Sequence, residues 1–229
     1  MASSSIFIAE VFRIGPVTVT NTVVVTWGIM LALWIAAWVV TRRLSVTPDR
    51  WQVVVEGIVS AIEDAIRVVL PDQVRRVMPF IATLWIFIVV ANLGSLIPGV
   101  RSPTGDLSLT AALAILVFLA VHWYGIRIHG LKDYLRHYLK PNPILLPFHI
   151  ISEISRTVAL AVRLFGNIFS LQMAALLILL VAGFLAPVPV LMLHIIEALV
   201  QAYIFGMLAL IYVAGAIQSQ QLKRSQEKE

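Results

Sequence analysis

Residues 22–40 read TVVVTWGIMLALWIAAWVV, an apolar stretch without a charged side chain. A helix needs about 20 mostly apolar residues to cross the hydrocarbon core of a membrane. Arg42 and Arg43 follow the stretch, whereas a cleavable signal peptide carries its positive charge before the apolar run. The sequence therefore predicts an uncleaved membrane anchor whose C-terminal end lies in the cytoplasm.

The composition of the whole chain also indicates a membrane protein. Of its 229 residues, 60% are hydrophobic and only 13% are charged, whereas a soluble domain has about 25% charged residues. The 17 Lys and Arg residues outnumber the 12 Asp and Glu residues, and in a membrane protein such an excess sets topology rather than binding nucleic acid. The chain has no cysteine, which excludes thiolate metal sites. We expect a single membrane domain over residues 1–229.

Residues 48–78 predict a helix of a different type. Apolar residues recur there at helical spacing, but charged residues interrupt them throughout. This pattern is typical of an amphipathic helix that lies on the membrane surface or against a partner, and Pro71 should end or kink it. Residues 79–126 then predict a hairpin of two membrane-crossing helices with a turn at 99–107.

Residues 149–218 predict a second hairpin of two long helices, about His149–Phe184 and Val190–Gln218, joined by a proline-containing turn. At 1.5 Å per residue the first would reach about 50 Å, which exceeds a hydrocarbon core of about 30 Å. It must therefore tilt strongly, bend or begin in the interface. We expect an all-α fold with about five membrane-crossing helices, the last two long and strongly tilted, plus one amphipathic surface helix.

Basic residues are concentrated after the first span, in the loop at 127–140 and in the C-terminal tail. Five crossings place these three segments on one side and the turns at 99–107 and 185–189 on the other. Because loops rich in Lys and Arg stay in the cytoplasm, we expect the N-terminus outside and the C-terminus in the cytoplasm.

Two charged residues, Arg163 and Glu197, lie deep within the apolar sequence of the last two helices. A charge at mid-span costs about 2.5–3.5 kcal/mol, so it is kept for a partner, a water path or a transported ion. At 100° per residue each helix also carries a polar stripe. The stripes comprise Ser152, Arg156, Arg163, Asn167 and Ser170 on the first helix, and His194, Glu197 and Gln201 on the second, with Tyr212 roughly in line. Such groups hold water and pass protons.

Structural roles are the alternatives for these residues. Arg163 could snorkel to a span end or form a structural pair with Glu197. For His194 and Glu197 the alternative is a purely structural hydrogen bond. Asn92 and Ser95 are expected to satisfy backbone groups or pack helices rather than carry ions. No phosphate-binding glycine loop, metal-ligand spacing or Ser/His/Asp set indicates an enzyme.

The run RLFGN at 163–167, followed by an apolar helix, a proline-containing turn and HIIEALVQAYIF at 194–205, resembles subunit a of the F-type ATP synthase. That subunit is the stator half of the membrane rotary motor. The resemblance implies a non-catalytic subunit without a cofactor, in the inner membrane of a bacterium. The partners it implies are a ring of c subunits, the b subunits of the peripheral stalk, the rest of the ATP synthase and the lipid bilayer.

The resemblance also implies roles for single residues. Arg163 matches the essential arginine that faces the ion-binding carboxylates of the c-ring, between two offset aqueous half-channels. Glu153, with Ser152 close by, matches an acidic position of the inner half-channel. Polar positions of the outer half-channel are matched by Asn167, His194 and Gln201.

Gln172 departs from the family pattern, because many members have Glu at that position and Gln cannot titrate. Glu197 is the residue that could supply the missing acid. By angle, Gln172 lies on the opposite side of an ideal helix from Arg163. Arg156 and Thr157 stand where a Lys-Pro pair is common.

These features together predict an ion-translocating subunit, with protons as the default coupling ion. A fixed guanidinium stabilises an ionised carboxylate opposite it, so a c-ring carboxylate that passes Arg163 should release its ion. Sodium coupling remains an alternative, because the ion site lies mainly on the ring. A stand-alone secondary transporter would show an internal repeat or paired broken helices, and the sequence has neither. A purely structural anchor would leave Arg163 and Glu197 unexplained.

Overall fold

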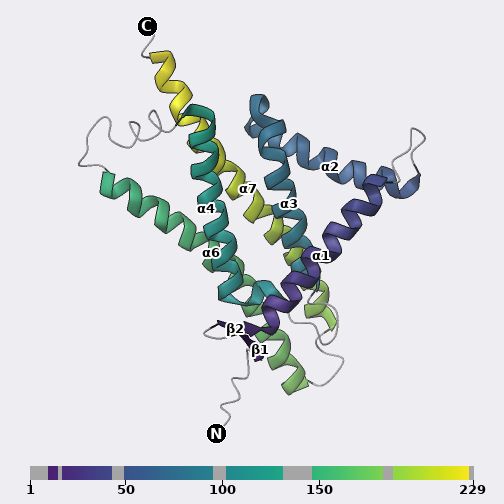
Figure 1. Cartoon of the computed structure of the whole chain (residues 1–229). Helices are drawn as coiled ribbons and strands as arrows, with labels where there is room; N and C mark the ends of the chain where they lie inside the picture. Colours follow the sequence, from purple (N-terminus) through teal and green to yellow (C-terminus); the bar gives the residue numbers. More distant parts are fainter. Residues whose placement is uncertain are drawn as a thin grey trace.

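The computed structural model describes residues 10–14, 17–42, 49–94, 102–130, 146–182 and 188–226. These residues are almost entirely helical (Figure 1), which confirms the all-α prediction. The long helices are α1 (Asn21–Arg42), α2 (Arg50–Val69), α3 (Val74–Leu93), α4 (Leu107–His129), α6 (Leu146–Ala182) and α7 (Val188–Gln226). Two 3₁₀ turns, η1 (Pro71–Gln73) and η3 (Pro103–Gly105), precede α3 and α4.

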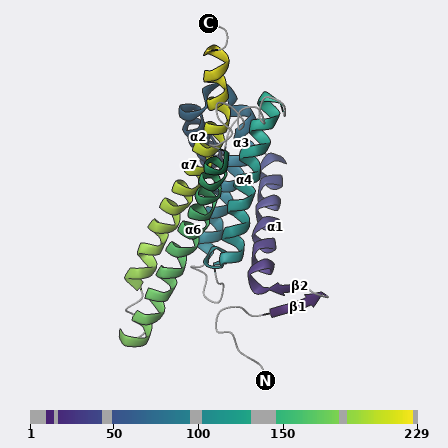
Figure 2. The ribbon, with the colours of Figure 1, turned by 90° about the vertical axis from the view of Figure 1, so that its left-hand side faces the viewer.

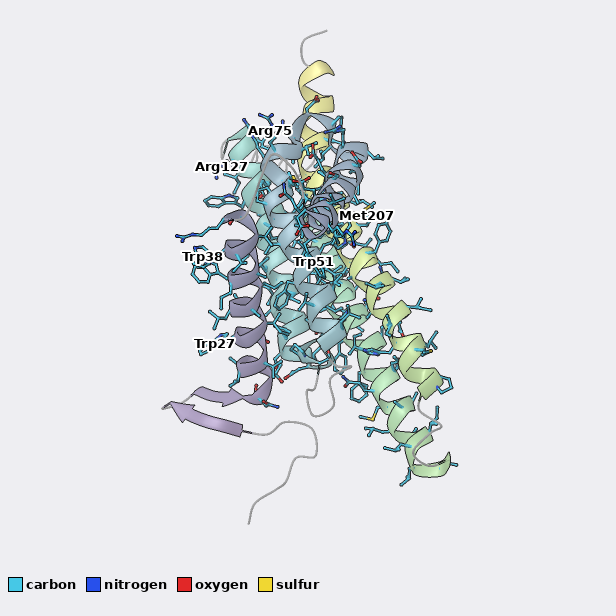
Figure 3. All side chains as sticks on the ribbon, turned by 90° about the vertical axis from the view of Figure 1, so that its right-hand side faces the viewer. Trp27, Trp38, Trp51, Arg75, Arg127 and Met207 are labelled. Atoms are coloured by element: carbon cyan, nitrogen blue, oxygen red, sulfur yellow. The ribbon has the colours of Figure 1, made fainter. Side chains whose placement is uncertain are left out.

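Five of the described helices, α1, α3, α4, α6 and α7, are long and apolar enough to cross a membrane. The prediction of five crossing helices is confirmed. On α1, the side chains of Trp27 and Trp38 point away from the bundle (Figure 3), and both are exposed. Exposed tryptophans on a spanning helix are typical of anchors at the membrane–water interface.

A short antiparallel hairpin precedes α1, and the sequence analysis assigned no structure to this segment. Strand β1 (Glu10–Ile14) pairs with β2 (Val17–Thr20), with Ile14 opposite Val17 and Glu10 opposite Thr20. All four residues of β2 are β-branched, and such residues favour strands because their side chains pack well on a pleated surface.

Helix α2 is the amphipathic helix, and it is shorter than the 48–78 segment predicted for it. The Asp49 carboxylate accepts a hydrogen bond from the backbone N–H of Arg50 and caps its start. The helix ends at Val69, and Pro71 begins η1, as expected. Because α3 starts at Val74, the boundary predicted at residue 79 falls inside α3. Pro79 is the sixth residue of that helix, beyond the first turn, so its missing N–H removes one intrahelical hydrogen bond.

The core lies where α3, α4 and α7 pack together. Its largest fully buried side chains include Ile81 and Ile88 of α3, Val117 of α4, and Phe205 and Leu210 of α7. Helix α2 joins this core through its C-terminal half only, whereas Trp51, Val53 and Val54 in its first two turns are exposed.

Helices α6 and α7 form a long hairpin that slants away from α3 and α4 and extends beyond them (Figure 2). The span within α6 covers 35 residues, or about 50 Å at 1.5 Å per residue. The expected pair of long helices is therefore present, and it is inclined relative to α3 and α4 (Figure 2). Helix α7 is longer than predicted, because it continues to Gln226, whereas α6 is nearly the predicted length and begins earlier, at Leu146.

Candidate functional site at the α6–α7 hairpin

Arg163 lies on the exposed side of α6. The residues beside it that face inward, Leu160, Leu164 and Ile168, are buried in the bundle, whereas the Arg163 side chain is exposed. Among the described residues it has no hydrogen bond and no ion pair; the salt bridge found among them joins Arg67 to Glu63. The structural pair with Glu197 that the sequence left open is therefore not formed.

The surface around Arg163 is apolar. Large hydrophobic side chains are exposed on both helices of the hairpin: Val158 and Val162 on α6, and Ile196, Leu199, Val200 and Tyr203 on α7. An exposed apolar surface of this extent is typical of a lipid-facing or partner-facing side of a membrane protein. Arg163 is thus a cation set in a hairpin surface that carries many exposed apolar side chains.

Asn167 and Gln201 join the two helices one turn beyond Arg163. The Asn167 Nδ2 group donates to Gln201 Oε1 over 2.6 Å. Gln201 is only 1% exposed, and its Nε2 group has no hydrogen-bond partner among the described residues. A buried N–H group normally has an acceptor, either from the protein or from ordered water. The Nε2 group of Gln201 is therefore a donor whose acceptor is not among the described residues.

A second contact fixes how the two helices are aligned. The Arg156 guanidinium lies 5.7 Å from the centre of the Tyr212 ring on α7. Asn167 lies 11 residues after Arg156 on α6, and Gln201 lies 11 residues before Tyr212 on α7. The helices are therefore antiparallel and in constant register over this stretch, which places Arg163 level with Phe205.

His194 is buried near the start of α7. Its Nε2 atom lies 3.4 Å from the backbone oxygen of Asn92 on α3. The Asn92 side chain is fully buried and donates from Nδ2 to the backbone oxygen of Ala198 over 3.3 Å. The prediction that Asn92 satisfies a backbone group is confirmed, whereas Ser95 lies outside the described residues.

Glu197 and Gln172 occupy different surroundings. Glu197 is partly exposed and has no hydrogen bond or ion pair with a described residue. Gln172 is partly buried against η3, where a Cβ atom added to Gly105 would lie 2.9 Å from its Oε1 atom. Gln172 thus packs toward the bundle while Arg163 is exposed, in agreement with the helix angle between them.

Ser152 and Glu153 lie near the start of α6, about 15 Å from Arg163 along the helix axis. Ser152 is exposed and Glu153 is partly exposed. The antiparallel register puts His194, Glu197 and Gln201 on the other side of Arg163. The polar residues of the hairpin therefore fall into two sets, separated along α6 by the arginine.

A family model described as "ATP synthase A chain" matches residues 23–214 of this sequence. The chain belongs to the ATP synthase A chain family. Consistent with this, it is 62% identical over 218 residues to "ATP synthase subunit a 2" of Pelobacter propionicus, an alignment that covers 95% of this chain and 96% of that one. It is 60% identical over 217 residues to subunit a of Legionella pneumophila strain Paris, covering 94% of both chains. It is 67% identical over 206 residues to subunit a 1 of Hahella chejuensis, covering 90% and 88%.

Membership of the ATP synthase A chain family makes this chain a non-catalytic membrane subunit of the ATP synthase complex. Its partners are the other subunits of that complex, and the five long apolar helices among its described residues support an integral membrane protein.

The sequence analysis missed the part of the site that α3 and η3 contribute. It considered Asn92 but not Thr104, whose hydroxyl donates to Asn92 Oδ1 over 2.6 Å. Both are short polar residues, and neither shares a helix with the RLFGN run. The signal in the sequence was weak. Asn92 is one polar residue at the end of an apolar span, and Thr104 lies in a connecting segment, where polar residues usually face water.

Proposed function

We propose that the chain translocates ions in a rotary F-type ATP synthase, with Arg163 facing the carboxylates of the c-ring. The observation that carries this proposal is the environment of Arg163, which is exposed at mid-helix in an apolar surface and lacks a partner among the described residues. A cation in such a surface is favourable when a partner supplies the opposite charge. A moving ring of carboxylates supplies it repeatedly.

The two sets of polar residues support two offset half-channels. Asn167, Gln201, His194 and Glu197 would line the outer one, and Glu153 with Ser152 the inner one. The Nε2 group of Gln201 has no partner among the described residues. This favours a hydrated outer path, because a water molecule in that path would accept a hydrogen bond from it. The positive charge of Arg163 between the two sets would prevent an ion from passing directly between them.

Glu197, rather than Gln172, would supply the titrating group of the outer half-channel. Gln172 cannot bind and release a proton, and its amide packs against Gly105. Glu197 is partly exposed and has no hydrogen bond or ion pair among the described residues. Protons are the default coupling ion in this proposal.

The same proposal places the N-terminus outside and the C-terminus in the cytoplasm of a bacterial inner membrane. Arg75 and Arg127 lie at the end of the bundle where the C-terminus emerges (Figure 3). Basic residues at one end of a bundle favour the cytoplasmic side for that end. The c-ring and the b subunits are the partners that the hairpin surface and the rest of the chain would meet in the complex.

The test is ATP-driven ion pumping by membrane vesicles that contain the assembled complex with Arg163→Ala. We expect pumping to be abolished while the complex still assembles, as measured by dye quenching and by subunit immunoblot. Arg67→Ala is the matched control, because this arginine is exposed on α2 and lies outside the hairpin; it should pump at the native rate. Coupled pumping by Arg163→Ala would remove the proposed mechanism.

A further inference from the structure

A buried polar cluster joins η3, the end of α3 and the middle of α7. Asn92 and Thr104 are 0% exposed, and Ser102 is 4% exposed. The Thr104 Oγ1 atom donates to Asn92 Oδ1 over 2.6 Å, and the Ser102 hydroxyl oxygen lies 2.6 Å from that of Thr104 and 3.1 Å from the backbone oxygen of Ala91. Polar groups buried this deeply lower stability unless they are hydrogen-bonded, so their arrangement is strongly constrained.

The chemistry of the neighbours determines the orientation of the Asn92 amide. The backbone oxygen of Ala198 can only accept, so Asn92 must turn Nδ2 toward it. Its Oδ1 atom then faces Thr104, whose hydroxyl has one proton and must donate it. Ser102 can give its own proton to Thr104 or to Ala91 without changing this result.

Asn92 in turn contacts the functional face of α7 at two points. Ala198 lies one turn after His194 and less than one turn before Gln201, so the three residues share one face of the helix. Asn92 donates to Ala198 at the middle of this face, and its backbone oxygen lies 3.4 Å from His194 Nε2. The amide of Asn92 therefore sits between the two residues proposed to line the outer half-channel.

We infer that Thr104 is a positioning residue for ion translocation: its hydroxyl fixes the Asn92 amide, which holds the His194–Gln201 face of α7 in place. This inference rests on the proposed function. Thr104 does not contact the ion and acts only through Asn92. A side chain that merely fills space would need the volume of Thr104 but not its hydroxyl.

Two substitutions in the assembled ATP synthase separate these roles. Thr104→Val keeps the shape and removes the donor, whereas Thr104→Ser keeps the donor and removes a methyl group. We expect Thr104→Val to lower ATP-driven pumping per assembled complex by about three- to tenfold, the effect of leaving a buried acceptor without its donor. Thr104→Ser should pump within about twofold of the native rate, because the hydrogen bond is retained.

A double-mutant comparison then tests whether the effect passes through Asn92. Once Asn92→Ala has removed the amide, adding Thr104→Val should change the pumping rate no further, because contacting residues that act as a unit are not additive. If Asn92→Ala prevents assembly, the Val and Ser variants alone decide the question.

Several outcomes would overturn the inference. These are native pumping by Thr104→Val, equal losses in the Val and Ser variants, loss of assembly by Thr104→Val alone, or additive losses with Asn92→Ala. Arg163→Ala is measured in the same vesicles. If it pumps, the proposed function fails; if it is inactive while Thr104→Val pumps normally, only the role of Thr104 fails.

Discussion

At Gly206 the lack of a side chain allows α3 to approach α7 closely. A Cβ atom added there would overlap the indole ring of Trp85. The Trp85 Nε1 group donates to the backbone oxygen of Tyr203 over 3.3 Å, and the two rings stack with centroids 5.9 Å apart. This contact and the one from Asn92 to Ala198 are two places where a side chain of α3 donates to the backbone of α7.

Gly206→Ala should therefore destabilise the subunit. Overpacking of a core costs about 1–3 kcal/mol, and the Trp85 ring that must move is itself buried and hydrogen-bonded. We expect a lower melting temperature of the purified complex and less subunit in the membrane. Gly28→Ala is the matched control, because a Cβ atom added at Gly28 meets nothing within 4 Å. Equal stability of the two variants would contradict the close approach.

Glu197→Gln should slow proton conduction and leave assembly intact. The substitution keeps the size of a partly exposed side chain but removes the group that binds and releases a proton. We expect a several-fold lower rate of passive proton flow through the membrane sector, measured by the decay of a pH gradient in vesicles. Glu56→Gln is the control, because Glu56 is exposed in the first half of α2. A native rate for Glu197→Gln would make that residue structural.

The residues of the hairpin were more predictable than those that support it. A period of 100° per residue is enough to put Asn167 and Gln201 on stripes that can face each other, and the structure joins them. The helical period alone does not predict that Arg163 takes no part in this hydrogen bond, because the rotation and tilt of α6 depend on its packing against α4. The contact between Thr104 and Asn92 lies between different elements, so no helical period encodes it.

At the scale of elements, the length of each apolar run predicted the long apolar helices correctly, whereas the residues at which helices begin and end were predicted less well. The spans α1, α3, α4, α6 and α7 follow from runs that water cannot solvate. The start of α3 was placed too late, because Pro79 was taken as the beginning of a helix that already starts at Val74. Proline is tolerated within membrane-spanning helices, because neighbouring groups satisfy the backbone that it frees.

Helix α2 has two halves with different roles, and substitution should distinguish them. Ile66 is 0% exposed in the core, whereas Ile58, two turns earlier, is 50% exposed. Ile66→Ala should cost about 2–5 kcal/mol of stability, as for a large-to-small change in a core, and Ile58→Ala much less. Thermal unfolding of the purified complex measures both. Equal effects would mean that a partner or lipid covers the first half of α2 as firmly as α3 covers the second.

At the scale of the whole molecule, the absence of cysteine provides a direct test of orientation. Ser108, at the start of α4, and Asp72, in η1, are both exposed, and the proposed topology places them on opposite sides. A membrane-impermeant maleimide should label Ser108→Cys from outside the cell and Asp72→Cys only in inverted vesicles. The reverse pattern would invert the proposed topology, and labelling of both from one side would contradict the crossing by α3 between them.

Arg163 has no counter-charge among the described residues, and this has a consequence for biogenesis. A freshly inserted copy exposes an unneutralised guanidinium to lipid tails, at an expense of about 2.5–3.5 kcal/mol on insertion scales. Under the proposed function, docking against the carboxylates of the c-ring would relieve this penalty, so the subunit would be more stable in the assembled complex than by itself. An orphan copy is accordingly a preferred target for membrane proteases, and cells should accumulate little of this chain when its partners are not made.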